Sequence, residues 1–466
     1  MTPSSQGGAH AFRGSDAMRA SRDGIYRAVW RWHFYAGLLC LPFLVLLSTT
    51  GAIYLYKDEI NATLFAHRTE VAAQNRASVS ASRLVYTASE AVPGGVPVSF
   101  TGQASATASA LVTMREGGSR IQVYLNPYNA DVLDVVNVES DPMMVVRRLH
   151  SLSYFGTVAN GIVEVVAGFA IILVVTGTYL WWPRGQGGGK GGGVVTVRAT
   201  PSKRVWWRDL HAVTGLVAGA GLFFLAITGL PWSVWWGQQV RALSNEAGLG
   251  QPRALWAGKA VSAVPMKDRL TQAGWTMEDA PMPVSQPADA PAIGLDRALA
   301  ILDGLGMPRG YEVALPEGPT GIYAAAIYPR DVDRQRLISL DQYTGAPLVD
   351  VAFADLGSVG QAIQYGIGLH KGEYWGRLNQ LAMLAFCLAT ILLSVTAAVM
   401  WWKRRPASGL GVPPWPRDRR IAATVTALVL GLGALFPLTG LAILAMIGLD
   451  LGIQALRRQA RRPAAA

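Results

Sequence analysis

Cysteine and charge are both scarce in this chain. Its 466 residues include only two cysteines, Cys40 and Cys387, and both fall inside apolar stretches. A disulfide framework is therefore excluded, and any domain outside a membrane must be held by its own core. Charged residues make up 15% of the chain against 51% apolar residues, with 15 Trp. This balance is typical of a helical membrane protein and argues against a soluble one.

A nucleotide-binding motif is also missing. No Gly-x-Gly-x-x-Gly follows a predicted strand, so no bound nicotinamide or flavin domain is evident. The run from Gly185 to Gly191 resembles a phosphate loop in composition only, because Arg184 and Gly191 stand where that loop needs its first Gly and its Ser or Thr. We interpret the run as a flexible linker. If the chain transfers electrons, they must come from quinol or from a separate cytoplasmic reductase.

The basic residues follow a membrane pattern. The net charge is +11, but Lys and Arg gather in short clusters beside the apolar stretches, which is the positive-inside distribution and not a nucleic-acid surface. The N-terminal residues lack the apolar run and cleavage site of a signal peptide, so they are predicted to be a cytoplasmic tail before an uncleaved anchor. The clusters that we place in the cytoplasm are 13–31, 184–208, 403–420 and 457–462.

Four apolar stretches have the roughly 20 residues that a bilayer requires. A fifth stretch, Ile421 to Ile453, contains Pro437 and would be about 50 Å long as one helix, so we favour a membrane hairpin over a single extended span. The predicted order is a disordered cytoplasmic tail 1–24, span one 25–57, outer module one 58–145, span two 146–183, a cytoplasmic linker 184–205, span three 206–237, outer module two 238–365, span four 366–403, a cytoplasmic loop 404–420, the C-terminal hairpin 421–455 and a cytoplasmic tail 456–466.

Four of the six histidines lie at the starts of the four spans and form two matched pairs. His33 and His211 are each followed by Gly four residues later and by a Thr-Gly pair at Thr50-Gly51 and Thr228-Gly229. His150 and His370 share Tyr at four residues, Gly at six, Thr at twenty-six (Thr176, Thr396) and a Trp-Trp pair at thirty-one and thirty-two. The first and third spans therefore resemble each other, as do the second and fourth. The chain consists of a span, an outer module and a span, repeated once.

Matched imidazoles in duplicated spans point to bis-histidine cofactor sites. A single histidine in an apolar span is more often a hydrogen-bonded structural residue, but four at matched positions favour iron ligation, and the usual group for such sites is haem. Spans one and three enter from the cytoplasm and spans two and four from outside. We therefore expect His33 and His211 to hold one b-type haem at the inner face, and His150 and His370 to hold a second one at the outer face.

The outer histidines lie farther from the Trp pairs at the other ends of their spans than one membrane crossing requires. His150 lies 32 residues before Trp182, which is about 48 Å of continuous helix against a hydrocarbon core of about 30 Å. Either the helix breaks near Gly156, or the outer haem lies at or above the interface. The same spacing separates His370 from Trp402.

The outer modules follow the same pattern, a helix and then strands. In the first, a helix at 81–94 precedes a strand at 119–125 and the turn Asn126-Pro-Tyr-Asn-Ala130. In the second, a helix at 295–305 precedes strands at 312–315, 322–327 and 336–339 and the turn Asp341-Gln-Tyr-Thr-Gly345. The fold class is therefore a mainly α membrane protein with four core transmembrane helices in two repeats, a C-terminal apolar helical hairpin and two α+β outer modules.

These motifs resemble a known family. The two modules, with their turns Asn-Pro-Tyr-Asn-Ala and Asp-Gln-Tyr-Thr-Gly, look like PepSY domains. The Arg-Leu-His before span two, the Thr-Gly-Thr-Tyr-Leu-Trp-Trp-Pro-Arg at its end, the Asp-Leu-His-Ala-Val-Thr-Gly of span three and the Phe-Pro-Leu-Thr-Gly of the tail resemble PepSY-associated transmembrane proteins over about residues 25–455. Members of that family are often iron-regulated proteins of the bacterial inner membrane, and some are dihaem ferric-siderophore reductases.

The resemblance implies a haem-dependent ferric-chelate oxidoreductase. Electrons would pass from a quinol or cytoplasmic reductase, through the inner and outer haems, to a ferric siderophore held in the periplasm by the PepSY-like modules, and ferrous iron would leave. Two alternatives stay open: a PepSY-based membrane anchor that binds peptides or a protease without redox activity, and a transporter of the intact siderophore.

Other polar residues have simpler expected roles. His10 and His67 lack matched copies and are expected to be solvated. Glu164, inside span two, is expected either to bond a neighbouring helix or to carry protons. Gly37 and Gly215 could admit a haem ring or simply pack helices. The basic residues that flank the outer histidines, which could offset haem propionates or simply be solvated, are Arg147, Arg148 and Lys371.

Overall fold

The computed structural model describes most of the chain as two compact units. The helical unit comprises Met1–Gly51, His150–Trp236 and Leu384–Ala466, and the sheet unit comprises Ala52–Leu149 and Gly237–Met383. The described residues are 7–183, 193–199, 203–252, 255, 260–271, 273–407, 409–416 and 418–460. Most of the predicted glycine-rich linker and the last residues of the C-terminal tail lie outside them.

Five helices in the described part of the chain are long and apolar enough to cross a membrane. They are α1 (Gly7–Tyr54, of which 23–54 is the span), α6 (Thr157–Trp181), α7 (Lys203–Gly229, whose span runs to Trp232), α11 (Gly376–Arg404) and α13 (Pro437–Ala460, of which 437–454 is the span). The first four coincide with the four predicted spans. The chain is thus a multi-pass membrane protein. Helix α1 already begins at Gly7, inside the segment 1–24 that was predicted to be a disordered tail.

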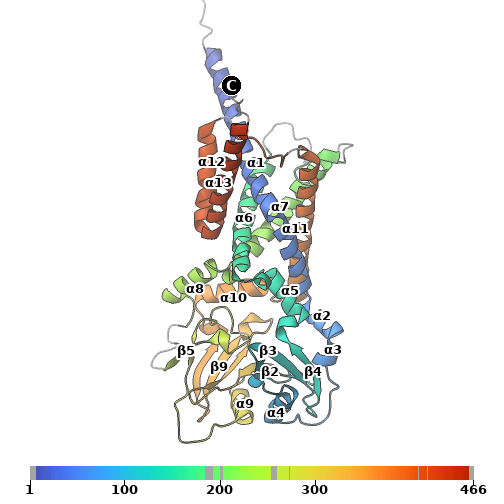
Figure 1. The fold of residues 1–466 in the computed structure, drawn as a ribbon, viewed down its shortest axis with the longest axis vertical. Helices are drawn as coiled ribbons and strands as arrows, with labels where there is room; N and C mark the ends of the chain where they lie inside the picture. The colour runs from blue at the N-terminus through green and yellow to red at the C-terminus, as the bar shows by residue number, and fades with distance from the viewer. Residues whose placement is uncertain are drawn as a thin grey trace, which may run out of the picture. The chain divides into compact units, whose positions relative to one another are not determined.

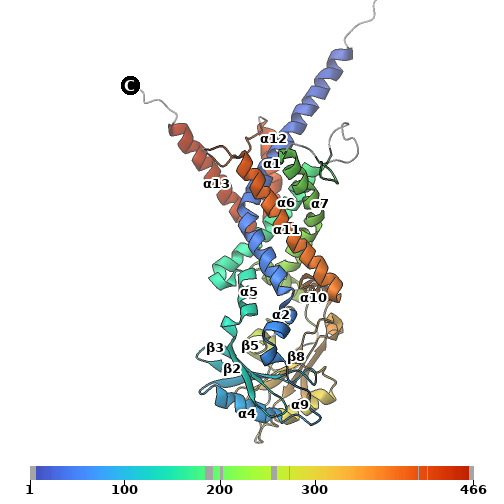
Figure 2. The same cartoon turned by 90° about the vertical axis from the view of Figure 1, so that its right-hand side faces the viewer.

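Helices α1, α6, α7 and α11 form a bundle (Figure 2), with small residues at their contacts. Gly221 of α7 faces the ring of Phe386 in α11 so closely that no Cβ would fit, and Gly168 of α6 faces Thr439 in the same way. Such close approach of backbones is how helices pack in lipid, where no hydrophobic effect draws them together.

The C-terminal apolar segment folds back on itself. Helix α12 (Arg419–Leu435) ends at Phe436, α13 begins at Pro437, and the two lie side by side (Figure 1). The backbones of Gly433 and Gly440 touch across the bend, so a side chain at either position would collide with the other. Proline lacks an N–H and fits the first turn of a helix, which explains why the chain turns at this point.

The helix that leads into span two breaks before the membrane. Helix α5 (Pro142–His150) is followed by the short η2 (Ser153–Phe155), and α6 starts after Gly156, whose φ of 95° favours glycine. Span four has the same form, because α10 (Ser358–His370) ends at a turn containing Gly372 and α11 begins at Gly376. Of the two solutions offered for the 32-residue spacing, the break is the one that the structure contains.

In the sheet unit, the strands of both predicted modules form one antiparallel sheet. Its order is β10-β9-β8-β7-β1-β2-β3-β4, and β1 joins the halves by pairing with β7, for example Phe100 with Val313. The strands are β1 (Val96–Thr101), β2 (Ala110–Glu116), β3 (Ser119–Leu125), β4 (Val132–Asn137), β7 (Glu312–Ala314), β8 (Ile322–Ile327), β9 (Arg336–Asp341) and β10 (Pro347–Ala352), with a separate pair β5 (Val261–Pro265) and β6 (Pro281–Pro283).

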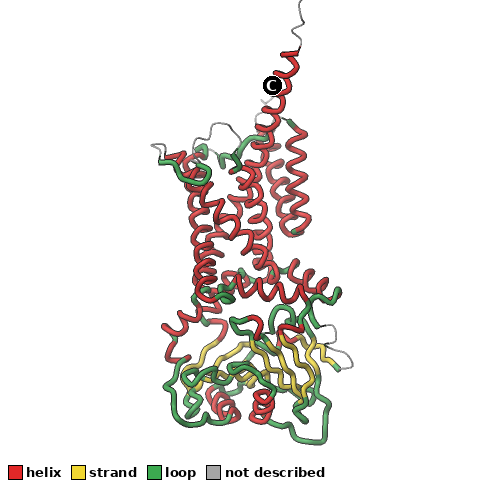
Figure 3. The backbone as a smooth tube through the Cα atoms, turned by 180° about the vertical axis from the view of Figure 1, so that it is seen from behind, coloured by secondary structure: helices red, strands yellow, loops and turns green. Residues whose placement is uncertain are grey.

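One face of this sheet is covered along both halves, and the other face is covered over β7 to β10. Helices α4 (Ala81–Ala91) and α9 (Leu295–Gly304) lie on the same face (Figure 3), where Leu84 and Leu302 share a core with strand residues of both halves. On the other face, Met266 and Leu270 from the connection after α8 pack on the sheet. Strand β8 shows both faces, because Tyr323 and Ala325 join the first core while Ala324 and Ala326 join the second, which is the alternation of a fully buried strand.

The two halves of the sheet repeat the same turn. Ala130 N–H donates to the carbonyl of Asn126 at 2.9 Å, and Gly345 N–H donates to the carbonyl of Asp341 at the same distance. Both turns end in a residue with positive φ, 64° at Ala130 and 71° at Gly345.

The remaining elements are α2 (Lys57–Leu64), α3 (Ala66–Thr69), η1 (Val138–Ser140), η4 (Leu230–Trp232), α8 (Trp236–Glu246), η5 (Met266–Asp268), η6 (Val332–Arg334) and η7 (Phe353–Asp355).

Candidate functional site

Two of the four predicted ligands lie within electrostatic range of each other in the helical unit. His33 comes from α1 and His211 from α7, and their rings are close enough to interact electrostatically. Each residue lies near the basic end of its span, as the sequence predicted. The bundle therefore contains a pair of imidazoles contributed by the two repeats.

The His33 ring is held by a threonine of the neighbouring helix. Its Nδ1 lies 2.9 Å from Oγ1 of Thr176 in α6, and the Thr176 hydroxyl donates its own proton to the carbonyl of Ile172 at 2.6 Å. A hydroxyl has one proton, so with that proton donated to Ile172 the Thr176 oxygen accepts from Nδ1–H of His33. The proton of the neutral ring therefore lies on Nδ1 and the lone pair on Nε2, which is the form that binds iron through Nε2.

His211 is held in the same way by α11. Its Nδ1 lies 2.9 Å from Oγ1 of Thr396, whose hydroxyl donates to the carbonyl of Leu393 at 2.8 Å. The ring also comes within hydrogen-bonding reach of the Leu393 carbonyl. Both inner histidines thus present Nε2 as the lone-pair nitrogen, although their holding threonines come from different helices.

The third histidine, His150, is the last residue of α5 and contacts α1. Its Nδ1 lies 3.1 Å from Oγ1 of Thr50, and the Thr50 hydroxyl donates to the carbonyl of Leu46 at 2.7 Å. Burial lowers the pKa of His150, which favours the neutral ring. The ring also comes within hydrogen-bonding reach of the Leu47 carbonyl.

Glycines beside these threonines make room for the rings. A Cβ at Gly177, next to Thr176, would lie 3.2 Å from Cε1 of His33, and a Cβ at Gly51, next to Thr50, would lie 3.2 Å from Cε1 of His150. Thr50-Gly51, which the sequence offered only as a marker of the repeat, is thus a cradle for His150, and Thr176-Gly177 is one for His33. Gly37, in contrast, faces Leu173 at an ordinary 3.7 Å, which fits plain helix packing.

His370 is the last residue of α10 and belongs to the sheet unit, whereas His150 belongs to the helical unit. Their pairing therefore stays a prediction. The turn after His370 is held by ions: Glu373 pairs with Lys371 at 2.8 Å and also with Lys57. The charge of Lys371, which we considered as a partner for haem propionates, is therefore already balanced, as is that of Arg148 by Glu139.

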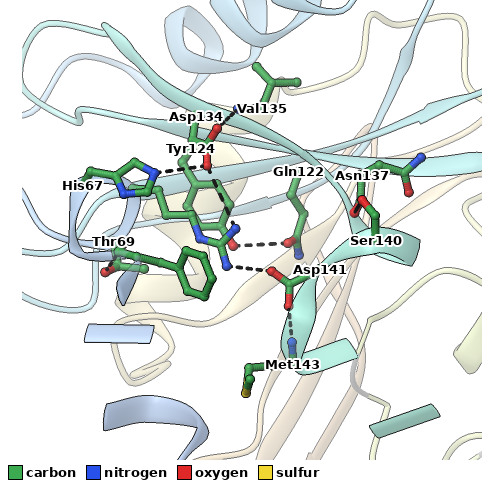
Figure 4. A network of polar contacts seen from close by, with 12 residues as sticks. His67, Thr69, Gln122, Tyr124, Asp134, Val135, Asn137, Ser140, Asp141 and Met143 are labelled. Carbon is green, nitrogen blue, oxygen red and sulfur yellow. Dashed lines mark hydrogen bonds and ion pairs between the residues drawn. The ribbon is translucent and has the colours of Figure 1, made fainter. Parts of the chain in front are cut away.

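A buried arginine anchors the helix that ends in His150. Arg68 of α3 is only 4% exposed and donates to Asp141, which is labelled in Figure 4, at 2.6 Å. Asp141 stands before α5 and also accepts from the N–H groups of Met143 and Met144 at 3.0 and 3.3 Å, which caps the helix. One carboxylate thus fixes the start of α5 while holding Arg68.

Aromatic rings and a second carboxylate complete this network. The Arg68 guanidinium lies 4.3 Å from the ring centre of Phe65 and 5.2 Å from that of Tyr124. Asp134 lies 4.0 Å from Arg68 and 3.4 Å from Nε2 of His67. His67 is mostly exposed, as expected, but it has this partner; the side chain of His10 lies outside the described residues.

Glu164 is fully buried in α6 and bonds the chain beyond span three. Its Oε2 accepts from the backbone N–H groups of Trp235 and Trp236 at 2.9 and 3.4 Å, where α8 begins. A carboxylate at a helix start satisfies N–H groups that have no helical partner. Of the two expected roles, the structure contains this hydrogen bond.

The threonines are the functional residues that sequence reasoning missed. Thr176, Thr396 and Thr50 all stand at repeated positions. A sequence repeat does not show, however, which residue on another helix each threonine contacts. A useful signal was nevertheless present: Thr is one of few residues that can bond a buried imidazole inside an apolar span, and three of the four matched histidines use one.

A histidine pair in a helical bundle, together with a mixed α and β unit, characterises this multi-pass membrane protein. Residues 30–404 match the sequence model of the PepSY-associated TM region. The chain belongs to that family. No curated protein matches the chain.

Proposed function

We propose that the chain is a dihaem electron conduit that reduces a ferric siderophore outside the inner membrane. The observation that carries the proposal is that His33 and His211 lie within electrostatic range of each other, with the lone pair of each ring on Nε2. A buried imidazole is costly in a membrane unless it is bonded or coordinated. Here Nδ1 is bonded, and iron coordination would use Nε2.

These side chains suit haem. A haem held by two histidines would need neutral imidazoles with lone pairs presented between helices, and hydrogen bonds that fix the orientation of each ring. His33 and His211 would hold the inner haem, and His150 and His370 the outer one. When bound, haem supplies one-electron redox chemistry at both ends of the bundle.

The protein itself would hold the histidine rings in place and keep water away from them. Thr176, Thr396 and Thr50 orient the rings, and the apolar helix walls keep water from the ligands. The Arg68 network fixes the start of α5 through the Asp141 cap. One electron would convert the ferric chelate into the ferrous chelate. Ferrous iron binds hard oxygen ligands more weakly, so the metal would leave. The electron donor is either quinol or a cytoplasmic reductase.

The siderophore is proposed as the substrate because of the family resemblance. The orientation in the membrane is inferred from the basic clusters. Positive-inside placement puts the start of α1 and the end of α11 in the cytoplasm, which makes the site of His33 and His211 the inner one. The sheet unit would then be periplasmic and would bind the chelate.

The test is the absorption spectrum of the purified protein and of single-histidine variants. We expect a reducible b-type signal, and we expect His33→Ala and His211→Ala to lose the same part of it. His67→Ala is the matched control, because His67 is exposed and bonded only to Asp134. A folded but colourless wild-type protein would contradict the proposal and favour the peptide-binding anchor.

Reconstituted vesicles separate the reductase from a transporter. A reductase produces ferrous iron from external ferric chelate only when an internal reductant is supplied. Accumulation of intact chelate without reductant would instead support the transporter.

A further inference from the structure

We propose that the threonines hydrogen-bonded to the histidines set the reduction potentials of the two haems. Thr176 and Thr396 would act on the inner haem and Thr50 on the outer one. They are positioning residues, because they act through the histidines and do not touch iron. This inference rests on the proposed function, since it assigns roles around the same ligands.

The first step is the direction of each hydrogen bond. All three threonine hydroxyls have their proton in a bond to a carbonyl in their own helix, at 2.6 Å to Ile172, 2.8 Å to Leu393 and 2.7 Å to Leu46. With the hydroxyl proton in that bond, the oxygen accepts from Nδ1–H. The histidine cannot turn to its other tautomer without leaving a buried N–H unpaired.

The second step is the electronic effect on the ligand. An acceptor on Nδ1–H makes the imidazole a stronger electron donor at Nε2, which stabilises ferric over ferrous iron. A carboxylate acceptor does this strongly, whereas a neutral hydroxyl does it weakly. Threonine therefore fixes the ring without lowering the potential as far as a carboxylate would. This suits a haem that must accept electrons readily from its donor.

The third step is a difference between the two inner histidines. The ring of His211 also reaches the backbone carbonyl of Leu393, which would still accept a proton if Thr396 were replaced. Thr176 is the hydrogen-bond partner that the structure gives His33. Loss of the hydroxyl should therefore change the inner haem more through Thr176 than through Thr396.

The experiment is redox titration of Thr176→Val, Thr396→Val and Thr50→Val in the full-length protein. We expect Thr176→Val to raise the potential of one haem by up to a tenfold change in the ferrous-to-ferric ratio, about 59 mV for one electron. Thr396→Val should move the same haem by less, and Thr50→Val should move the other haem. The EPR spectrum of the ferric protein should change for the same haem in each variant.

The chain offers matched controls. Thr178 lies in the same helix as Thr176 and Thr390 in the same helix as Thr396, and each bonds only its own helix, at 2.8 Å. Thr178→Val and Thr390→Val should leave both potentials unchanged. Thr176→Ser keeps the hydroxyl and should retain the wild-type potential, even if the valine variant does not hold haem.

The outcomes distinguish the two proposals. A wild-type protein without haem would overturn the proposed function and this inference together. If the wild-type protein binds two haems but none of the three valine substitutions changes either reduction potential, this inference alone is overturned. The same holds if Thr176→Ser fails as Thr176→Val does, or if Thr176→Val and Thr396→Val move different haems.

Discussion

At the scale of single residues, the same arrangement of a histidine and a threonine occurs three times in the helical unit. A polar ring must lie in an apolar bundle, and each time a threonine accepts from Nδ1 of that ring. At two of the three sites a glycine beside the threonine leaves room for the ring edge. The arrangement needs only short side chains, so it fits between closely packed helices. It also leaves one ring nitrogen with a lone pair, which is the requirement for binding iron.

The glycine beside each cradle threonine gives a prediction. Gly177→Ala places a methyl group 3.2 Å from Cε1 of His33, so the ring must shift and the inner haem should be retained less well. Gly37→Ala is the matched control in α1, because its methyl group meets Leu173 at an ordinary 3.7 Å. The measurement is the ratio of haem to protein after purification. Equal retention in the two variants would argue against a close fit at His33.

Much of each single element was predictable from the sequence, because the signals are local. The bounds predicted for the strands 119–125 and 322–327 match β3 and β8, and the positive-φ turns follow from Asn126-Pro-Tyr-Asn-Ala130 and Asp341-Gln-Tyr-Thr-Gly345. The break before span two was one of two options that the helix length allowed. The threonine bonds could not be predicted, since each joins residues 100 or more positions apart on different helices.

At the scale of elements, α5 starts beside the Arg68 network and ends at His150, which we propose as a ligand. Arg68→Met removes a buried charge and leaves Asp141 without its cation, so we expect a loss of about 3 kcal/mol in the free energy of unfolding. The outer haem should also be lost first, and the inner haem should stay. Thermal unfolding followed at the haem absorption band measures both.

A surface ion pair serves as the control for this prediction. Arg115 pairs with Glu317 at 2.9 Å, with both side chains more than 40% exposed, so Arg115→Met should cost less than about 1 kcal/mol. Equal losses for the two arginine variants would contradict a clamp at the start of α5. So would an outer haem that survives Arg68→Met unchanged.

At the scale of the whole molecule, the repeat is visible in both units but the units use it differently. In the helical unit, each repeat contributes one histidine to the inner pair. In the sheet unit, the repeated modules merge through β1 and β7 into one sheet with a shared core, in which Leu84 of one half and Leu302 of the other are both buried. Sequence patterns predict strands but not which distant strands pair, so this joining became visible only in the structure.

Duplication gives a simple physical route to two sites. Each predicted span carries or follows one proposed ligand, and two such spans would complete a site, so four spans would give two sites. The account therefore stands or falls on the number of haems.

The most direct measurement is the molar ratio of b-type haem to chain in purified wild-type protein, from the pyridine haemochrome spectrum and the protein mass. The account predicts two haems per chain, both reducible, with one lost in His33→Ala. A ratio of zero in a folded protein would contradict it outright. A ratio of one that disappears in both His33→Ala and His150→Ala would show that the ligands are paired differently.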